Sequence, residues 1–251
     1  MSPRIFVLGD AVVDQLYFVP RLPEHGGEIA ATNALMQPGG SASNVAVALK
    51  RFGADVAFAA RAGTDDLATL ALANLRALQV SERWLQFDSE RSTSVVALFV
   101  TPDAERTMVS AAAASRHLDV AGFEPGTLKQ FDAAVFSAYC FLGERQREYA
   151  EAVMADAQAA NKHIIIDIGI AAYYGLGRDE LLAACRGATY LLLNEHELSL
   201  LSGKHDVHEG RADLHAAGFP NLIIKLGANG SFVSTPETEQ HVPAVVIPEV
   251  V

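Results

Sequence analysis

The feature that most restricts the fold of this chain is the alternation of short apolar runs with segments of helical periodicity. Residues 4–9 form an apolar run that ends in glycine, a pattern typical of a strand buried on both faces of a sheet. Further strands are predicted at 56–60, 135–137, 164–166, 191–193 and 222–226, and helices at 41–52, 64–78, 144–161, 178–185, 195–202 and 207–217. This order predicts an α/β fold in which helices cover both faces of a mostly parallel sheet, within a single domain over residues 1–251.

Two stretches do not follow this alternation, because their strands have no helix between them. Residues 13–37 hold most of two predicted strands, at 12–19 and 28–37. Residues 93–111 hold a predicted hairpin. We expect these two stretches to pair with each other as a small sheet beside the main one.

The charge of the chain excludes some classes of partner. Lys and Arg number 19 against 30 Asp and Glu, a net charge of −11, so we expect no nucleic acid and no anionic membrane as partner. No apolar run reaches the roughly 18 residues of a membrane span, and the first residues do not resemble a signal peptide. Cys140 and Cys185 form no CxxC motif, so we expect core thiols and a cytoplasmic location.

Asp14 is the first residue with a candidate binding role. It follows the first predicted strand and lies in a β-rich apolar stretch, where aspartate is unfavourable. The ligand of an open parallel sheet lies beyond the carboxyl ends of the strands, and a carboxylate there can accept hydrogen bonds from sugar hydroxyls. An aspartate in a turn or at a strand edge explains the residue equally well.

A glycine turn precedes the first predicted helix, which we expect Ser41 to cap. Gly39 and Gly40 allow the backbone to approach a ligand, and the helix start offers free N–H donors. Asn44 adds an amide that can contact a polyol. A glycine turn before a helix is also common without any ligand. The chain has neither GxGxxG nor GxxxxGK[ST], so a Rossmann dinucleotide site and a P-loop lack support.

Two further candidate segments follow later strands. Asn194 and Glu197 carry oxygen ligands suited to a hydrated Mg²⁺ with phosphates. The alternative, which the pattern alone favours, is a helix N-cap with a capping-box glutamate. Lys225, Gly227 and Gly230 suit the phosphates or ribose of a nucleotide. Their alternative is a strand–turn–strand connection.

These features, in this order and spacing, resemble the ribokinase-like carbohydrate kinase family of the phosphofructokinase B type. The resemblance extends over essentially the whole chain and rests on the segments 9–14, 39–53, 63–66, 194–197 and 225–230. Ala68 departs from it, because the family usually has glycine at that place. Each segment is weak alone, whereas the ordered set is specific.

The resemblance implies a ribokinase-like three-layer α/β/α sandwich in which the stretches 13–37 and 93–111 form a lid over the substrate. It implies an ATP-dependent kinase that transfers the γ-phosphoryl group to a hydroxymethyl hydroxyl of a sugar or sugar derivative. Its cofactors would be ATP and Mg²⁺, and the need for a monovalent cation stays open. By resemblance the sugar is bound by Asp14, Gly39, Gly40 and Asn44, the nucleotide lies along Asn194, Lys225, Gly227 and Gly230, and Mg²⁺ is organised by Glu197.

The chain departs from the family pattern at its C-terminal end. The family's second signature, Asp-Thr-x-Gly-Ala-Gly-Asp, supplies the base and the anion hole, and residues 248–251 stop where it would begin. We therefore expect no catalytic residue within the chain and a base aspartate beyond Val251, in a C-terminal part of the fold that the sequence lacks. Phosphoryl transfer depends on positioning and charge stabilisation, so we expect these 251 residues alone to be inactive.

The acceptor stays open at this point. Some family members place an acid near 137–144 that contacts the sugar, and this chain has none before Glu144. Tyr139 is the nearest candidate, as a stacking or hydrogen-bonding contact or simply as a core residue. Ribose, a ketohexose, a sugar acid and a nucleoside all fit. The alternative functions are a nucleoside kinase of the same family and a sugar- or nucleoside-binding protein without catalysis.

The lid sequence also predicts a homodimer. In the strand at 93–101 both alternating sets of side chains are apolar. A lid that covers a substrate with one face therefore leaves its other apolar face exposed to solvent. A two-fold dimer covers such a face with one self-complementary surface, and some members of the family form lid-to-lid dimers. We expect Val96 and Leu98 to lie on the face that dimerises.

Overall fold

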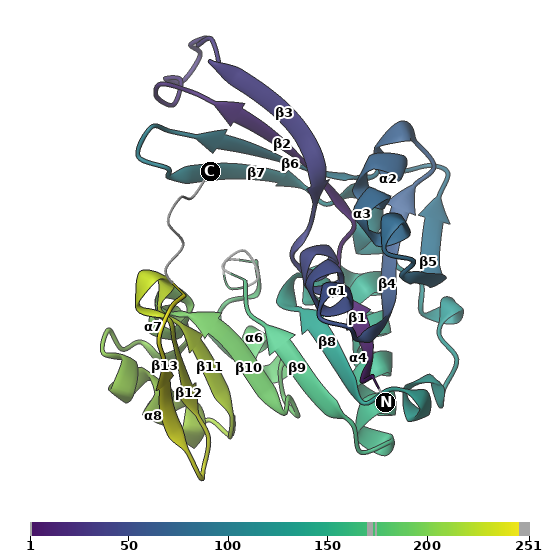
Figure 1. Cartoon of the computed structure of the whole chain (residues 1–251), viewed down its shortest axis with the longest axis vertical. Helices are drawn as coiled ribbons and strands as arrows, with labels where there is room; N and C mark the ends of the chain where they lie inside the picture. Colours follow the sequence, from purple (N-terminus) through teal and green to yellow (C-terminus); the bar gives the residue numbers. More distant parts are fainter. Residues whose placement is uncertain (1, 170–172, 174, 246–251) are drawn as a thin grey trace.

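The computed structural model describes residues 2–169, 173 and 175–245; residues 248–251, where the family pattern is interrupted, lie outside this part. A nine-stranded sheet has the order β13-β12-β11-β10-β9-β8-β1-β4-β5 (Figure 1). Its strands are β1 (Arg4–Leu8), β4 (Asp55–Gly63), β5 (Ser81–Asp88), β8 (Ala133–Ser137), β9 (His163–Asp167), β10 (Tyr190–Asn194), β11 (Leu222–Lys225), β12 (Ser231–Ser234) and β13 (Glu239–Val242). All neighbours from β5 to β11 are parallel, and β12 and β13 add an antiparallel edge.

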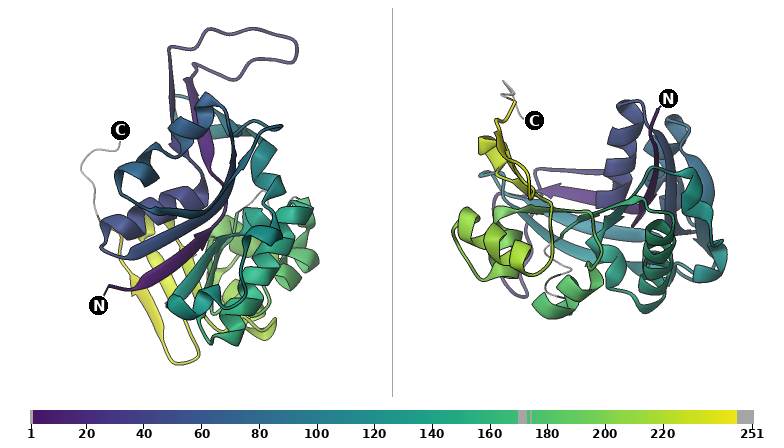
Figure 2. Two further views of the ribbon diagram at one scale, coloured as in Figure 1. Left: turned by 90° about the vertical axis from the view of Figure 1, so that its right-hand side faces the viewer. Right: turned by 90° about the horizontal axis from the view of Figure 1, so that it is seen from below.

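Helices cover both faces of this sheet, as predicted (Figure 2). The described helices are α1 (Ser41–Arg51), α2 (Asp66–Ala71), α3 (Ala73–Ala77), α4 (Glu144–Ala159), α6 (Arg178–Ala184), α7 (Glu195–Ser202) and α8 (Val207–Ala216), with short 3₁₀ turns η1 (Ala113–His117), η2 (Val120–Gly122), η3 (Thr127–Gln130), η4 (Ala138–Phe141) and η5 (Gly227–Asn229). Within the described residues, no helix is both long and apolar enough to span a bilayer.

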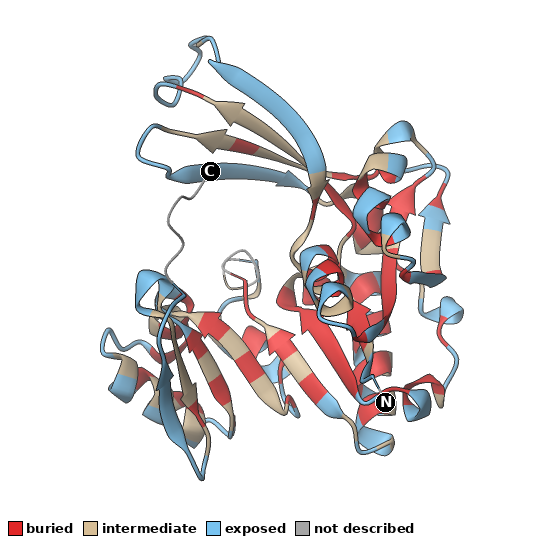
Figure 3. Ribbon diagram, viewed as in Figure 1, coloured by how far each residue is buried: buried red, intermediate tan, exposed pale blue. Residues whose placement is uncertain are grey.

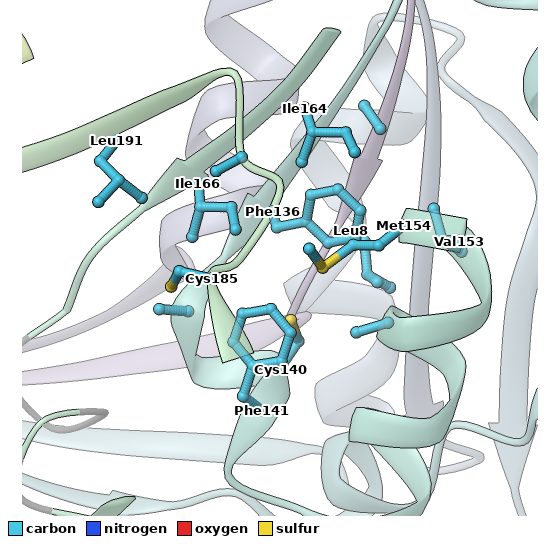
Figure 4. Close-up of a cluster of buried hydrophobic side chains, with 14 of the residues drawn as sticks. Leu8, Phe136, Cys140, Phe141, Val153, Met154, Ile164, Ile166, Cys185 and Leu191 are labelled. Carbon is cyan, nitrogen blue, oxygen red and sulfur yellow. The ribbon is translucent and has the colours of Figure 1, made fainter. Parts of the chain in front are cut away.

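Two hydrophobic cores lie on opposite faces of the sheet, because successive strand residues point to opposite sides. Val7 packs in the core under α1, whereas Phe6 and Leu8 pack in the larger core under α4. This explains why the predicted strands are apolar throughout. Cys140 and Cys185 are buried free thiols in the larger core, which confirms their interpretation as core residues (Figure 4).

A separate four-stranded sheet has the order β3-β2-β6-β7, and we call it the lid. It consists of β3 (Asn33–Gly39), β2 (Val12–Phe18), β6 (Ser94–Val100) and β7 (Arg106–Ala111). The pairing of β2 with β6 confirms that the two β-only stretches of the sequence join in one small sheet. The lid is more exposed than the main sheet (Figure 3).

Some elements differ from the prediction. β5 and β13 were not expected, because they lie at the sheet edges and carry many polar residues, and β12 was expected only under the strand–turn–strand alternative at 225–230. The helix predicted at 64–78 is two short helices, α2 and α3, that meet at Leu72. β3 begins at Asn33 and not at residue 28.

Candidate functional site

The order of the strands determines where a ligand can bind. From β1 the chain reaches β4 on one side, and from β8 it continues to β9 on the other, although β1 and β8 are neighbours. Ligands of open α/β sheets bind beyond the carboxyl ends of the strands at such a reversal. A cavity of about 500 Å³ lies there, lined by Asp10 after β1, by Tyr139 after β8 and by the inner face of the lid.

Asp14 points from β2 into this cavity. Gly39, on the neighbouring strand β3, lies directly against its side chain: a Cβ at Gly39 would come closer than 3.0 Å to Cγ and both oxygens of the Asp14 carboxyl group. Only glycine therefore leaves room for the carboxylate. Burial raises the pKa of Asp14, and the charge of Arg106 across the cavity lowers it by less.

Gly40 links the lid to helix α1. Its φ of 96° lies in the left-handed region, and a Cβ would come 2.5 Å from the carbonyl oxygen of Asp10, so glycine is required twice over. Gly40, not Ser41, is the N-cap, and no side chain caps the helix. The predicted Ser41 cap is wrong because Ser41 Oγ instead donates to Asp167 Oδ2 at 3.2 Å. Asn44 is exposed in the first turn and lines the cavity.

Tyr139 forms part of the cavity wall rather than of the core alone. Its ring lies on Gly169, where a Cβ would come 2.5 to 2.7 Å from three ring-end atoms. Burial raises the pKa of the Tyr139 hydroxyl, and the nearby carboxylates of Glu197, Asp167 and Asp10 raise it further. The hydroxyl therefore stays protonated and can donate to a ligand.

Asp10 is a cavity residue that was not predicted as part of the site. Its Oδ1 accepts a hydrogen bond from Nε2 of Gln146 on α4. Burial raises the pKa of Asp10, while this hydrogen bond and the charge of Arg116 lower it by less. Its position directly after β1 was the available signal, because that is where an open sheet places its ligand.

Asn194 and Glu197 form a capping box at the start of α7. Asn194 Oδ1 accepts from the Glu197 amide, and Glu197 Oε2 accepts from the Asn194 amide, both at 2.8 Å. This confirms the helix-cap interpretation that the pattern favours. Glu197 is 6% exposed. Burial raises its pKa; the hydrogen bond from the Asn194 amide and the charge of Lys225 lower it by less than burial raises it, and the charge of Asp167 adds a small rise.

The chemistry of this segment also fits Mg²⁺. In the capping box only Oε2 of Glu197 accepts a hydrogen bond, and Oε1 has no hydrogen-bond partner among the described residues. A cation would relieve the repulsion between Glu197 and Asp167. In the described part of the chain no cluster of three or more His, Cys, Asp or Glu could hold a metal, and Mg²⁺ typically needs only one or two carboxylates beside water and phosphates.

Lys225 lies at the end of β11, and its Nζ donates to Asp167 Oδ1 at 2.7 Å. The pair bridges the end of β10, because β9 and β11 flank that strand. Asp167 was not predicted, and it holds both Ser41 and Lys225. Sequence spacing cannot reveal such a link between distant segments.

Gly227 and Gly230 shape a tight turn between β11 and β12. Their φ angles are 57° and 89°, and the Leu226 amide donates to the Gly230 carbonyl at 2.8 Å. The strand–turn–strand alternative is thus present in the structure. The turn adjoins Lys225, which is exposed and is the register partner of Asn194 at the ends of β11 and β10.

Comparisons with known proteins agree with this architecture. The family model described as "pfkB family carbohydrate kinase" matches residues 2–251. A fructokinase from Klebsiella pneumoniae is 30% identical over 231 residues, which cover 89% of this chain and 71% of that protein. The structure of an adenosine kinase from Sinorhizobium meliloti has a TM-score of 0.83 at 20% identity, covering 100% of this chain and 83% of its own. The structure of Arabidopsis thaliana ribokinase complexed with ribose and ATP has a TM-score of 0.78 at 19% identity. The match covers 100% of this chain and 80% of the ribokinase chain.

Proposed function

Because the chain belongs to the pfkB family of carbohydrate kinases, we propose that it binds ATP together with a sugar or nucleoside, for transfer of the γ-phosphoryl group to a hydroxymethyl group of that acceptor. The acceptor binds in the cavity between α1 and the lid. The nucleotide binds along the neighbouring strand ends of β10 and β11. The fructokinase, ribokinase and adenosine kinase among the similar proteins support an acceptor of this kind.

The proposal rests mainly on the Asp14 carboxylate, which lines the cavity. Because Gly39 has no Cβ, the carboxyl group has space in this position. A carboxylate accepts two or more hydrogen bonds and suits adjacent hydroxyls. Asn44 and the Tyr139 hydroxyl supply further polar contacts, and the backbone at Gly40 lets the acceptor approach the start of α1. The lid covers the acceptor, which excludes water and limits hydrolysis of ATP.

The nucleotide side is proposed from the second group of residues. Lys225 carries a positive charge for phosphate, and the turn at Gly227 and Gly230 borders the nucleotide. Asn194 orients Glu197, and the second carboxylate oxygen of Glu197 would be available to hold Mg²⁺ or one of its waters. When bound, Mg²⁺ would neutralise charge on the phosphates. The ATP-bound ribokinase of the same fold supports ATP as the donor.

Calorimetric titration of the protein with Mg-AMP-PNP, D-fructose, D-ribose and adenosine tests the proposed function. We expect the nucleotide and at least one acceptor to bind together. Binding of an acceptor without any nucleotide binding would favour a sugar- or nucleoside-binding protein. Failure of every compound to bind would contradict the proposal.

Glu197→Gln is expected to raise the Mg²⁺ concentration required for nucleotide binding about tenfold and to leave acceptor binding unchanged. The glutamine oxygen can still accept from the Asn194 amide, so the capping box survives. Glu195→Gln, an exposed change in the same turn, is the control. If Glu197 only caps the helix, the glutamine keeps that role and the Mg²⁺ requirement does not change.

We also propose a homodimer through the lid, but the face expected for it was wrong. Val96 is paired with Asp14 and Leu98 lies opposite Met108, so both point into the cavity. The opposite face carries the stacked rings of Tyr17 and Phe99, 5.8 Å apart. On it Met36 is 51% exposed and Val109 63%, an apolar surface that a second copy would cover.

Sedimentation at micromolar concentration tests the dimer. We expect a dimer that Met36→Asp with Val109→Asp converts to a monomer, because buried unpaired carboxylates oppose association. Phe52→Asp is the control, since Phe52 is 89% exposed and lies at the end of α1. A monomeric wild type would refute the dimer, and a dimer that survives the double substitution would place the interface elsewhere.

A cytoplasmic location belongs to the same proposal. The buried, unpaired thiols of Cys140 and Cys185 support it, because free cysteines are common where thiols are kept reduced.

A further inference from the structure

Arg116 brings a positive charge to the cavity floor. It lies on η1, and its Nη1 donates to the Tyr139 carbonyl at 2.9 Å. The side chain crosses the backbone at Gly143, where a Cβ would come 2.8 Å from Cδ and 3.0 Å from Cβ of Arg116. The Arg116 carbonyl oxygen would also lie 3.0 Å from that Cβ. Gly143 has an ordinary φ of −105°, so its close packing against Arg116, and not its own backbone conformation, favours a glycine there. The position of Arg116 is thus built into the fold.

The charge of Arg116 has no ion-pair partner among the described residues, although its side chain is half-buried. The charge of Arg116 acts on the nearby acid Asp10 and lowers the pKa of its carboxyl group. That carboxyl accepts from Gln146, and burial favours its neutral form. A partly buried charge without a partner is unfavourable. The N–H groups that Tyr139 does not use are available to a ligand.

Arg106 adds a second guanidinium from the lid. In β7 it alternates with Met108 and Ser110 on the inner face, and all three line the cavity. The side chain of Arg106 makes no hydrogen bond or ion pair within the described structure. Its charge acts on Asp14 only across the cavity. Two arginines with free donors therefore face a site that also contains two carboxyl groups.

Resting on the proposed function, we propose that the acceptor is an anionic polyol, a sugar acid or a sugar phosphate, whose negative group binds Arg116 and Arg106 while its hydroxyls bind Asp14. A guanidinium only donates hydrogen bonds and matches a carboxylate or phosphate in a two-pronged geometry. A neutral sugar would leave the charge of Arg116 without a counter-ion once the lid excludes water. An anionic polyol satisfies the arginines and the acids together.

Two matched ligand pairs test this inference by calorimetry. D-Gluconate and D-sorbitol differ only in a carboxylate, and D-fructose 6-phosphate and D-fructose only in a phosphate. We expect the anionic member of one pair to bind about tenfold or more tightly than its neutral partner, and that pair identifies the anion. Neutral members that bind as tightly in both pairs would overturn the inference and leave the proposed function standing. If no member binds, this inference fails, and the titrations with Mg-AMP-PNP, D-ribose and adenosine decide on the proposed function separately.

Variants locate the effect. Arg106→Gln and Arg116→Gln should each weaken the anionic ligand about tenfold, and the neutral ligand should change less than about threefold. Arg83→Gln, an exposed arginine that pairs with Glu124 outside the cavity, should change neither. Equal losses for both ligands, or no loss, would show a structural role and overturn the inference. Arg106 is exposed on the lid, so its variant keeps the test valid should Arg116→Gln fail to fold.

Discussion

Asp14→Asn is expected to weaken acceptor binding by about 2–5 kcal/mol, because hydroxyl donors lose a charged acceptor in a closed site. This corresponds to roughly thirtyfold to several-thousandfold in Kd. Burial raises the pKa of Asp14, so the folded protein binds this proton more readily than the unfolded chain, and ionisation reduces stability as the pH rises. Removing the charge at neutral pH should therefore leave the melting temperature unchanged or slightly higher.

The matched control is Asp103→Asn, at the turn of the lid hairpin, where Asp103 accepts from Thr101 and faces no cavity. It should leave acceptor affinity unchanged. Calorimetry with the tightest-binding acceptor and a thermal melt of both variants decide the question. An Asp14→Asn protein that binds normally would return Asp14 to a turn or strand-edge aspartate.

Gly39→Ala is expected to reduce acceptor affinity as strongly as Asp14→Asn, although Gly39 offers the acceptor no side chain. The new Cβ would occupy the place of the Asp14 carboxyl group. The carboxylate must then rotate out of its position or the strands must separate. The loss in affinity thus arises from displacement of Asp14.

A double-mutant cycle separates this cause from a general disturbance of the lid. In an Asp14→Ala background the alanine at position 39 meets no carboxylate, so Gly39→Ala should change acceptor affinity less than about threefold there. Calorimetry on the wild type, both single variants and the double variant completes the cycle. A large additional loss in the Asp14→Ala background would contradict displacement and indicate damage to the β2–β3 pairing.

Local patterns in the sequence were sufficient for much of the fold. Successive residues of β1 are apolar because Val7 and Leu8 pack into the cores on opposite faces of the sheet. Such an apolar run can be recognised from the sequence alone. The capping box joins Asn194 and Glu197, three positions apart, and is equally local. β5 was not predicted because Trp84 is the only one of its eight residues that is both hydrophobic and buried.

The parts of the site that were missed depend on contacts between distant segments. The sequence predicts Ser41 as a helix cap, but its hydroxyl donates a hydrogen bond to Asp167, which is 126 residues away in the chain. Arg116 lines the cavity and packs closely against Gly143, 27 positions later in the chain. The alternation in β6 shows two apolar faces, and only the register with Asp14 reveals that Val96 faces the cavity.

A crystal structure of the protein with the tightest-binding acceptor from these titrations tests most directly whether the cavity under the lid is the acceptor site. We expect the ligand to lie between α1 and the lid, with hydroxyls within hydrogen-bond distance of the Asp14 carboxylate and a hydroxymethyl group directed toward the strand ends near Glu197 and Lys225. A ligand bound outside this cavity, or one inside it that does not touch Asp14, would contradict the proposed site.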